Sequence, residues 1–415
     1  MIRITVILFI ITRTCFGQNE TLTLDSCIQM AKNNYPLIKQ NNLIAENQKN
    51  DLKIDKSEYL PKLSFNSKAS YQSEVISFQG LTFPSDNYLT GISLEQTLYD
   101  GGVIKQRLKL DKLTGDNQIL ENQVELYKII DRVNELYSNI LLTRESIKAL
   151  NIYIDDIENK TKTNISAVKN GLALQSSLDE LDAEKLKTEQ SVVDESENLT
   201  ALYLNLGKFI NKTINDNTIL TIENSLNISE AEEIKRPELK LFDAQKLLLQ
   251  QTREYYSKTD YPKLSIGAEG NYGRPGPNFL NQNQRFFGSA NINLKWNISS
   301  LYNRNNEDQK LNINTQKIDV QREVFEFNLK NTLTTQLAKI KSLRTNIQKD
   351  KLIVDKRHSI TSTASNQLEN GSITTTDYLI QLNAEMQAVL NEKLHEIKLM
   401  NAIANYNTTK GIRNF

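Results

Sequence analysis

The chain carries the same pattern twice. The motif "PKLSF" at Pro61 recurs as "PKLSI" at Pro262, and "ISLEQTL" from Ile92 recurs as "INLKWNI" from Ile292. Two further pairs keep the same order: "NYPLIKQ" from Asn34 with "KRPELKL" from Lys235, and "NGLALQSSLDELDAE" from Asn170 with "NGSITTTDYLIQLNAE" from Asn370. A segment order that recurs without change indicates an internal duplication. We therefore predict a first repeat over residues 18–207, an inter-repeat segment over 208–236 and a second repeat over 237–415.

Most of each repeat is predicted to be helical. Only 15 Gly and 7 Pro among 415 residues leave little sequence for loops. Apolar residues three and four apart form a heptad seam, interrupted by polar Thr143, in the first repeat: Ile129, Val133, Leu136, Ile140, Ile147, Leu150, Ile154 and Ile157. A weaker seam, interrupted by Gln336 and Asp350, follows in the second: Leu329, Leu333, Ile340, Leu343, Ile347 and Val354. Without proline from Gly102 to Lys169, the first helix is expected to run unbroken for roughly 100 Å.

Each long helix is predicted to end at an Asn-Gly pair, Asn170-Gly171 and Asn370-Gly371. Glycine supplies the left-handed conformation that stops a helix. Because another amphipathic segment follows at once, each repeat should form a helical hairpin with its tip near residue 170 or 370.

Four segments alternate between apolar and polar residues over about ten positions, the length of a tilted membrane strand. They follow the two prolines as pairs: "LSFNSKASYQ" with "LTGISLEQTL", and "LSIGAEGNY" with "FFGSANINLKW". Alternation alone also fits a half-buried sheet in a soluble domain. An N-terminal signal and the lack of a further long apolar stretch favour the membrane. Because a barrel needs about eight strands or more, four strands require other copies, and three copies give about twelve.

The N-terminus has the features of a secretory signal peptide over residues 1–17. Arg3 precedes an apolar run from Ile4, and small residues Cys15 and Gly17 precede the predicted cleavage before Gln18. Whether Cys15 is removed or carries a lipid stays open. After cleavage only Cys27 remains, so the sequence predicts no disulfide framework and no cysteine metal cluster.

The sequence contains no pattern typical of catalysis. His358 and His395 lie in helical segments without a neighbouring Cys, and no phosphate loop, HExxH or Ser-His-Asp spacing is present. With 50 Lys+Arg against 50 Asp+Glu, the net charge gives no reason to expect nucleic-acid binding. We predict a protein that is not an enzyme and that uses no cofactor or metal.

In these motifs the chain resembles the TolC-like outer-membrane efflux proteins. The matching segments are "YPLIKQ", "YLPKLSF", "LEQTLYDGG" and the two stretches that begin at Asn170 and Asn370. The resemblance implies a homotrimer in which a twelve-stranded outer-membrane β-barrel continues into a long periplasmic α-helical barrel. It also implies a passive exit duct for efflux or type I secretion. Its partners would be outer-membrane lipid, a periplasmic adaptor protein and an inner-membrane RND or ABC transporter.

The resemblance also assigns candidate sites. The adaptor would dock at the hairpin tips, with Gly171, Leu172, Gly371 and Ser372 as candidates. Asp377 matches an acidic constriction residue of the family, with Glu180 and Asp179 as the candidates from the first repeat. Members with a charged lock at the tip carry an Arg and a Tyr where this chain has Ile373 and Leu368.

A second hypothesis is an exported coiled-coil structural protein outside the membrane. It explains the heptad seams but leaves the paired alternating segments unexplained.

Overall fold

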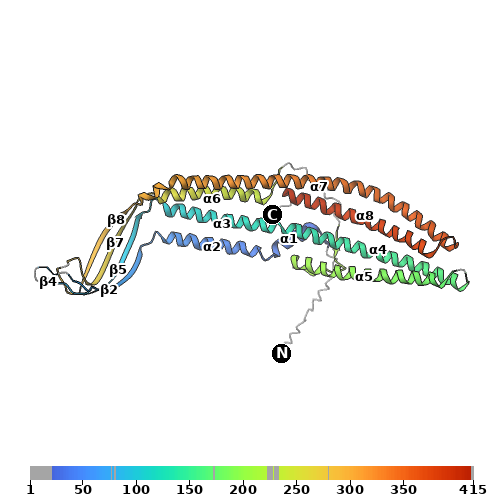
Figure 1. Cartoon of the computed structure of the whole chain (residues 1–415), viewed down its shortest axis with the longest axis horizontal. Helices are drawn as coiled ribbons and strands as arrows, with labels where there is room; N and C mark the ends of the chain where they lie inside the picture. Colours follow the sequence, from blue (N-terminus) through green and yellow to red (C-terminus); the bar gives the residue numbers. More distant parts are fainter. Residues whose placement is uncertain are drawn as a thin grey trace, which may run out of the picture. The chain divides into compact units, whose positions relative to one another are not determined.

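A computed structural model of the chain describes residues 21–75, 77–78, 81–171, 173–221, 228, 233–278 and 280–412 (Figure 1). The predicted signal peptide, with Cys15, and the tip residue Leu172 lie outside these residues. The helices are α1 (Leu24–Asn34), α2 (Ile38–Ser57), α3 (Val103–Tyr127), α4 (Ile129–Lys169), α5 (Gln175–Ile210), α6 (Pro237–Thr259), α7 (Arg304–Glu369) and α8 (Thr375–Lys410). The strands are β1 (Thr21–Leu22), β2 (Lys62–Tyr71), β3 (Ser77–Phe78), β4 (Leu81–Thr82), β5 (Asp86–Tyr99), β6 (Ile219–Leu220), β7 (Lys263–Arg274) and β8 (Arg285–Lys295). The prediction of a mainly helical chain with a small β part is confirmed.

The chain divides into two compact units, and both repeats contribute to each. One unit comprises Met1–Ile38, Glu125–Arg236 and Leu329–Phe415, and the other comprises Lys39–Val124 and Pro237–Asn328. We call the first the hairpin unit, because it holds the ends of α4, α5, α7 and α8. The second is the sheet unit. In the described part of the chain, no helix is long and apolar enough to cross a membrane.

The sheet unit contains the four predicted strands as one antiparallel sheet in the order β2-β5-β7-β8. Pro61 and Pro262 stand just before β2 and β7, where a proline can begin a strand without removing a ladder hydrogen bond. The register pairs Phe65 with Ile92, and Ile266 with Ile292. Cross-strand partners lie on one face of a sheet, so the alternation of each strand sorts the side chains into two faces.

One face of this sheet is mainly apolar and the other mainly polar, with Leu89 and Phe287 as apolar residues on the polar face. The apolar face carries Leu63, Phe65, Ala69, Tyr71, Ile92, Leu94, Leu264, Ile266, Ala268, Tyr272, Phe286, Ala290, Ile292 and Leu294. The polar face carries Ser64, Asn66, Lys68, Ser93, Glu95, Ser265, Glu269, Asn271, Ser289, Asn291, Asn293 and Lys295. On the apolar face Ile292 and Leu294 are 74% and 71% exposed in the single chain. An exposed apolar surface of this kind marks an interaction surface.

The sheet has two open edges. In the described residues β2 pairs with β5 alone and β8 pairs with β7 alone, so each outer strand has one row of unpaired backbone groups. Long, exposed edge strands are templates for pairing with another strand.

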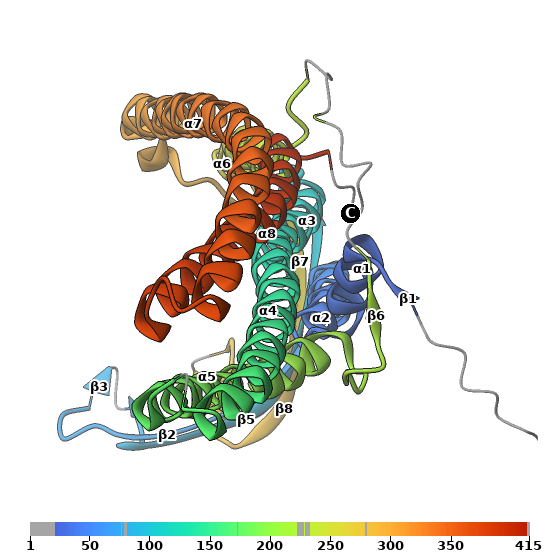
Figure 2. The ribbon, with the colours of Figure 1, turned by 90° about the vertical axis from the view of Figure 1, so that its right-hand side faces the viewer.

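The heptad seam forms the core of the hairpin unit. Ile130, Val133, Tyr137 and Ile140 are fully buried in one cluster with residues of α1, α5 and α8. Helix α4 packs against both α5 and α8, and Figure 2 shows the three helices side by side. The seam of the second repeat is buried at Leu329, Ile340 and Leu343 and is more exposed elsewhere, as its polar interruptions predict.

The prediction of one unbroken helix from residue 102 to 169 is wrong at Lys128. There α3 ends and α4 begins, and the Lys128 amide donates to the carbonyl of Glu125 at 3.2 Å, three residues back. The neighbouring Tyr127 is fixed at this point, because its hydroxyl donates to the Thr408 carbonyl at 2.6 Å and the Arg236 guanidinium lies 4.5 Å from its ring centroid. This anchoring accompanies a local tightening of the helix to the three-residue spacing. The corresponding α7 has no break.

Candidate functional site: the ends of the two helical hairpins

Both hairpins turn at the predicted Asn-Gly pairs. Gly171 and Gly371 have φ of 69° and 67°, the left-handed region that favours glycine. The Gly371 amide donates to the Leu368 carbonyl at 3.0 Å and the Ser372 amide to the Gln367 carbonyl at 2.8 Å, the two bonds of a Schellman motif. Gly171 makes the equivalent bond to Val168 at 3.0 Å. Gly171, Gly371 and Ser372 are exposed, so the tips offer their surface to a partner.

Asp377 takes part in the cap of α8. The Thr374 hydroxyl accepts from the Asp377 amide at 3.1 Å, and the Asp377 carboxylate accepts from the Thr374 amide at 3.0 Å and from its hydroxyl at 2.7 Å. This reciprocal arrangement is a capping box. The hydrogen bonds from the Thr374 side chain and backbone lower the pKa of Asp377. Asp377 is exposed and ionised at neutral pH, and within the single chain it helps to cap the N-terminus of α8.

The two acids of the first repeat have different surroundings. Asp179 accepts a hydrogen bond from Gln175 of its own helix at 3.1 Å. Glu180 accepts from the Thr376 hydroxyl at 3.0 Å, which joins α5 to the first turn of α8. The structure therefore brings Glu180 next to the helix start that holds Asp377, while Asp179 stays a local surface residue. Leu174, which precedes α5, makes no side-chain cap.

A buried lysine near the tips was missed by the sequence reasoning. Lys160 of α4 is 5% exposed, and its ammonium donates to the Ser365 hydroxyl at 2.7 Å, the Ser365 carbonyl at 3.2 Å and Glu369 at 2.9 Å. It also lies 5.2 Å from the centroid of the Tyr378 ring, within cation–π range. Lys160 thus ties the first hairpin to both helices of the second. Lys160 follows Ile157, the last residue of the heptad seam, by three residues. This spacing puts Lys160 on the buried side of α4, and it was the signal in the sequence from which the burial could have been predicted.

An apolar cluster supports this contact. It consists of Tyr153, Ile157, Leu181, Ala364, Tyr378 and Leu382. Leu368 and Ile373, which replace the charged lock of some TolC-like proteins, are partly buried against it. Burial in the cluster raises the pKa of Tyr378 to about 12, so its hydroxyl stays neutral.

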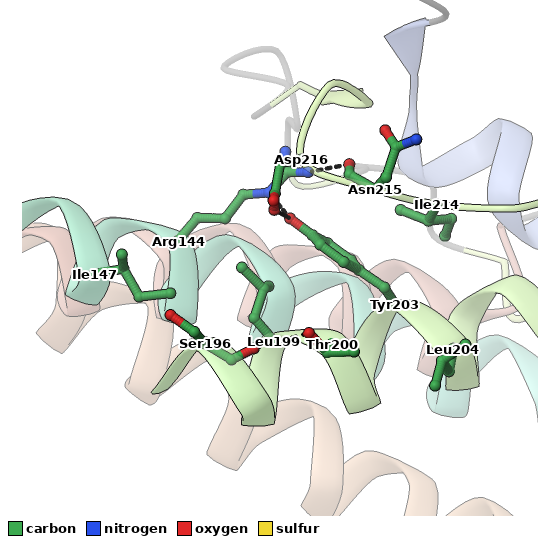
Figure 3. Close-up of a pocket in the computed structure, with 10 residues that line it drawn as sticks. All are labelled: Arg144, Ile147, Ser196, Leu199, Thr200, Tyr203, Leu204, Ile214, Asn215 and Asp216. Carbon is green, nitrogen blue, oxygen red and sulfur yellow. Dashed lines mark hydrogen bonds between the residues drawn. The ribbon is translucent and has the colours of Figure 1, made fainter. Parts of the chain in front are cut away.

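A separate cavity of about 540 Å³ lies where the inter-repeat segment meets α4 and α5 (Figure 3). Arg144 donates to the Tyr203 hydroxyl at 2.6 Å and to the carbonyls of Thr218 and Asn215 at 2.8 and 3.0 Å. Tyr203 in turn donates to Asp216 at 3.1 Å. Because the guanidinium is already engaged by protein groups, Arg144 serves to anchor residues 215–218 to the helices.

Within the part of the chain that the structure describes, no cluster of three or more His, Cys, Asp or Glu side chains could hold a metal ion. His358 contacts Glu385 at 2.8 Å and His395 contacts Asp350 at 2.6 Å, each as a pair.

The Lys160 contact can be tested by substitution. Lys160→Met keeps the apolar stem but leaves Ser365 and Glu369 without their donor, so we expect unfolding to become easier by about 1–3 kcal/mol. Lys185→Met is the matched control, because Lys185 forms an exposed pair with Glu158 at 2.7 Å and such pairs contribute little. Thermal unfolding of both variants measures the difference. Equal melting temperatures for the two would show that Lys160 does not stabilise the hairpin contact.

Comparison with known proteins gives the fold. No protein-family model and no curated protein sequence matches the chain. Solved structures do match. The outer membrane protein VceC of Vibrio cholerae superimposes with a TM-score of 0.71 at 11% identity, and the match covers 94% of this chain and 96% of that one. The Campylobacter jejuni CmeC outer membrane channel matches with a TM-score of 0.67 at 14% identity, over 94% and 85% of the two chains. The open state of the Neisseria gonorrhoeae MtrE outer membrane channel matches with a TM-score of 0.68 at 12% identity, over 94% and 88%. The chain therefore has the fold of outer-membrane channels, which confirms the TolC-like fold predicted from its sequence.

Proposed function

We propose that the protein is a passive exit duct in the bacterial outer membrane, serving a tripartite efflux pump or a type I secretion system. The observation that carries this proposal is the match to two outer-membrane channels and a further outer-membrane protein, over 94% of this chain and at least 85% of each of theirs. A duct performs no chemistry of its own, in keeping with a sequence that lacks catalytic patterns. Transport is driven by the partners.

The sheet supports a homotrimer. Its open β2 and β8 edges need hydrogen-bond partners, and in lipid an unpaired edge costs several kcal/mol per group. If β8 of one copy pairs with β2 of the next, three copies close a barrel of about twelve strands. The apolar face then meets outer-membrane lipid and the polar face lines the lumen, the alternation that such barrels use.

The hairpin tips are the proposed contact with the periplasmic adaptor, which connects the duct to an inner-membrane RND or ABC transporter. Gly171, Gly371 and Ser372 are exposed in the single chain, and both glycines have positive φ. An exported coiled-coil structural protein is less consistent with the fold, because it would have no use for a sheet with one apolar exposed face.

The assembly prediction concerns the apolar face. We expect a detergent-stable trimer, and we expect Ile292→Arg to destabilise it by about 2–4 kcal/mol if residue 292 lies at mid-membrane. Asn293→Arg is the control, since Asn293 stands on the polar face one residue along the same strand. Trimer melting in detergent measures both. A monomer that still forms pores, or a larger loss at Asn293 than at Ile292, would contradict the proposed closure and facing.

The docking prediction concerns Ser372 and Leu172. Replacing either with Arg should reduce efflux while the trimer keeps its melting temperature, and at Ser372 no left-handed conformation has to be kept. Gly371→Ala is the comparison variant. It should lower the free energy of unfolding by about 1 kcal/mol, because alanine is strained at the positive φ of this position, whether or not the tip contacts an adaptor. Drug-susceptibility assays and trimer melting separate the two effects. Parallel losses of efflux and stability at Ser372 would leave only a structural role for the tip.

The gate prediction concerns Asp377, which symmetry would turn into a ring of three carboxylates. Such a ring favours cations and binds multivalent cations. We expect Asp377→Asn to reduce cation selectivity and to weaken block by multivalent cations in planar bilayers. Since its pKa is lowered, the wild-type selectivity should persist through mildly acidic pH and fall only when the carboxylate is protonated.

The capping role of Asp377 requires its own control. Thr374→Ala removes the hydroxyl half of the capping box and should cost about 1 kcal/mol, yet it keeps the carboxylate and so the selectivity. If Asp377→Asn leaves selectivity unchanged, the constriction lies elsewhere. Glu180, which contacts Thr376, is then the next residue to test, followed by Asp179.

A further inference from the structure

A buried acid lies between α2 and α3 in the sheet unit. The Asp55 side chain is 1% exposed, and its Oδ1 accepts from the Arg107 Nε of α3 at 2.8 Å. Its other oxygen, Oδ2, is buried and has no hydrogen-bond donor among the described groups. A buried carboxylate oxygen without a donor is costly, typically about 1–3 kcal/mol. The structure therefore calls for a donor at Oδ2.

A second acid stands beside it. Asp111, one helical turn after Arg107 on α3, forms a hydrogen bond with the Asp55 carboxyl, and its Oδ2 is 3.9 Å from the Arg107 Nε. Ionised carboxylates only accept hydrogen bonds, so two of them can bond to each other only through a proton. One guanidinium cannot neutralise both, and Glu58 at the end of α2 also acts on Arg107. A proton held by Asp111 can supply the bond between the two carboxyls.

We propose that Asp55 and Asp111 share one proton, which makes the contact between α2 and α3 a pH-sensitive clamp. The clamp stands at the root of the β2–β5 hairpin, since α2 leads into β2 and β5 leads into α3. The connection from β5 to α3 is short. It is held in place because the Asp100 carboxylate accepts from the amides of Gly102 and Ile104 at 2.8 and 2.7 Å. Losing the proton leaves two adjacent carboxylates that repel each other and loosens the pair of helices.

The pH range follows from the surroundings of Asp111. Burial, the hydrogen bond to Asp55 and the charges of Asp55 and Asp51 raise the pKa of Asp111 from 3.8 to about 6, against the lowering effect of Arg107. From α6, the uncharged Gln251 contacts Gln106, next to Arg107. A folded-state pKa above the unfolded value means that the stabilisation is complete below 3.8 and is lost as the pH rises through about 6. The clamp is closed in acid and weakened above neutral pH.

Hydrogen exchange of the full-length protein in detergent tests the clamp. Protection factors, corrected for intrinsic exchange, are measured for peptides covering 39–57 and 103–124 between pH 5 and 8 in chelator-treated buffer. We expect wild-type protection there to fall about tenfold from pH 5 to pH 8. Asp111→Asn should stay protected throughout, because its amide donates to Asp55 Oδ2 at every pH. Glu46→Gln, the control at an exposed position of the same helix, should keep the wild-type pH dependence.

Three results would overturn the proposal: flat wild-type protection, full pH dependence in Asp111→Asn, or recovery of protection at pH 8 on adding Mg²⁺ or Ca²⁺. The last would assign the pair to a cation in place of a proton. If Asp111→Asn fails to fold, Asp111→Ala replaces it as the test variant. We expect Asp111→Ala to show low protection at every pH and no pH dependence. These measurements concern contacts within one chain, so their outcome is independent of the proposed duct.

Discussion

The hydrogen-bonding requirement of the two outer strands governs this architecture. In the four-stranded sheet, β5 and β7 have a hydrogen-bonded neighbour on both sides. Among the described residues, β2 and β8 have a neighbour on one side, so each keeps one row of amides and carbonyls without a strand partner. Among the described residues, no proline and no bulge interrupts β2 or β8, devices that protect the sheet edges of soluble proteins. The chain combines open edges with one exposed apolar face, and that combination is stable only where another copy completes the ladder and an apolar medium meets the face. The proposed trimer in lipid would meet these two needs together.

The features predicted from the sequence are those that local chemistry specifies. Alternation predicted the faces of β2, β7 and β8, because a side-chain period of two leaves no choice once one face is apolar. In β5 it held up to Thr97, where the register shifts and Tyr99, not the expected Leu98, lies opposite Leu264. Asn170-Gly171 and Asn370-Gly371 located both tips, since glycine is the residue that relieves the left-handed cap. The break at Lys128 escaped prediction because the contact that accompanies it is distant in sequence: the Tyr127 hydroxyl donates to the carbonyl of Thr408, near the other end of the chain. Lys160 and Asp55 were missed for the same reason, since their partners come from other helices.

The two repeats have diverged where their hairpins begin and end. The second repeat starts its return helix with the Thr374–Asp377 capping box, while the first has Leu174 in the equivalent place and no side-chain cap. The first repeat instead supplies Lys160, which reaches across to Ser365 and Glu369. Each hairpin thus contributes something that the other lacks: one a locally fixed helix start, the other a buried cation that holds the pair together. The duplication predicted from the sequence would account for the common plan, and this division of roles distinguishes the two copies.

Lys160 and Asp55, two buried charges of the helical packing, differ in how completely they are satisfied, and this difference sets what each can do. The Lys160 ammonium has hydrogen-bond acceptors and an aromatic ring beside it, so this side chain links the two hairpins in one geometry. Asp55 has a donor for one oxygen and none for the other, so its energy depends on the protonation of its neighbour Asp111. A fully satisfied buried charge specifies geometry, whereas a half-satisfied one couples geometry to the solution. Within one chain, the first kind holds the hairpins near their tips and the second makes the helices below the β2–β5 hairpin sensitive to pH.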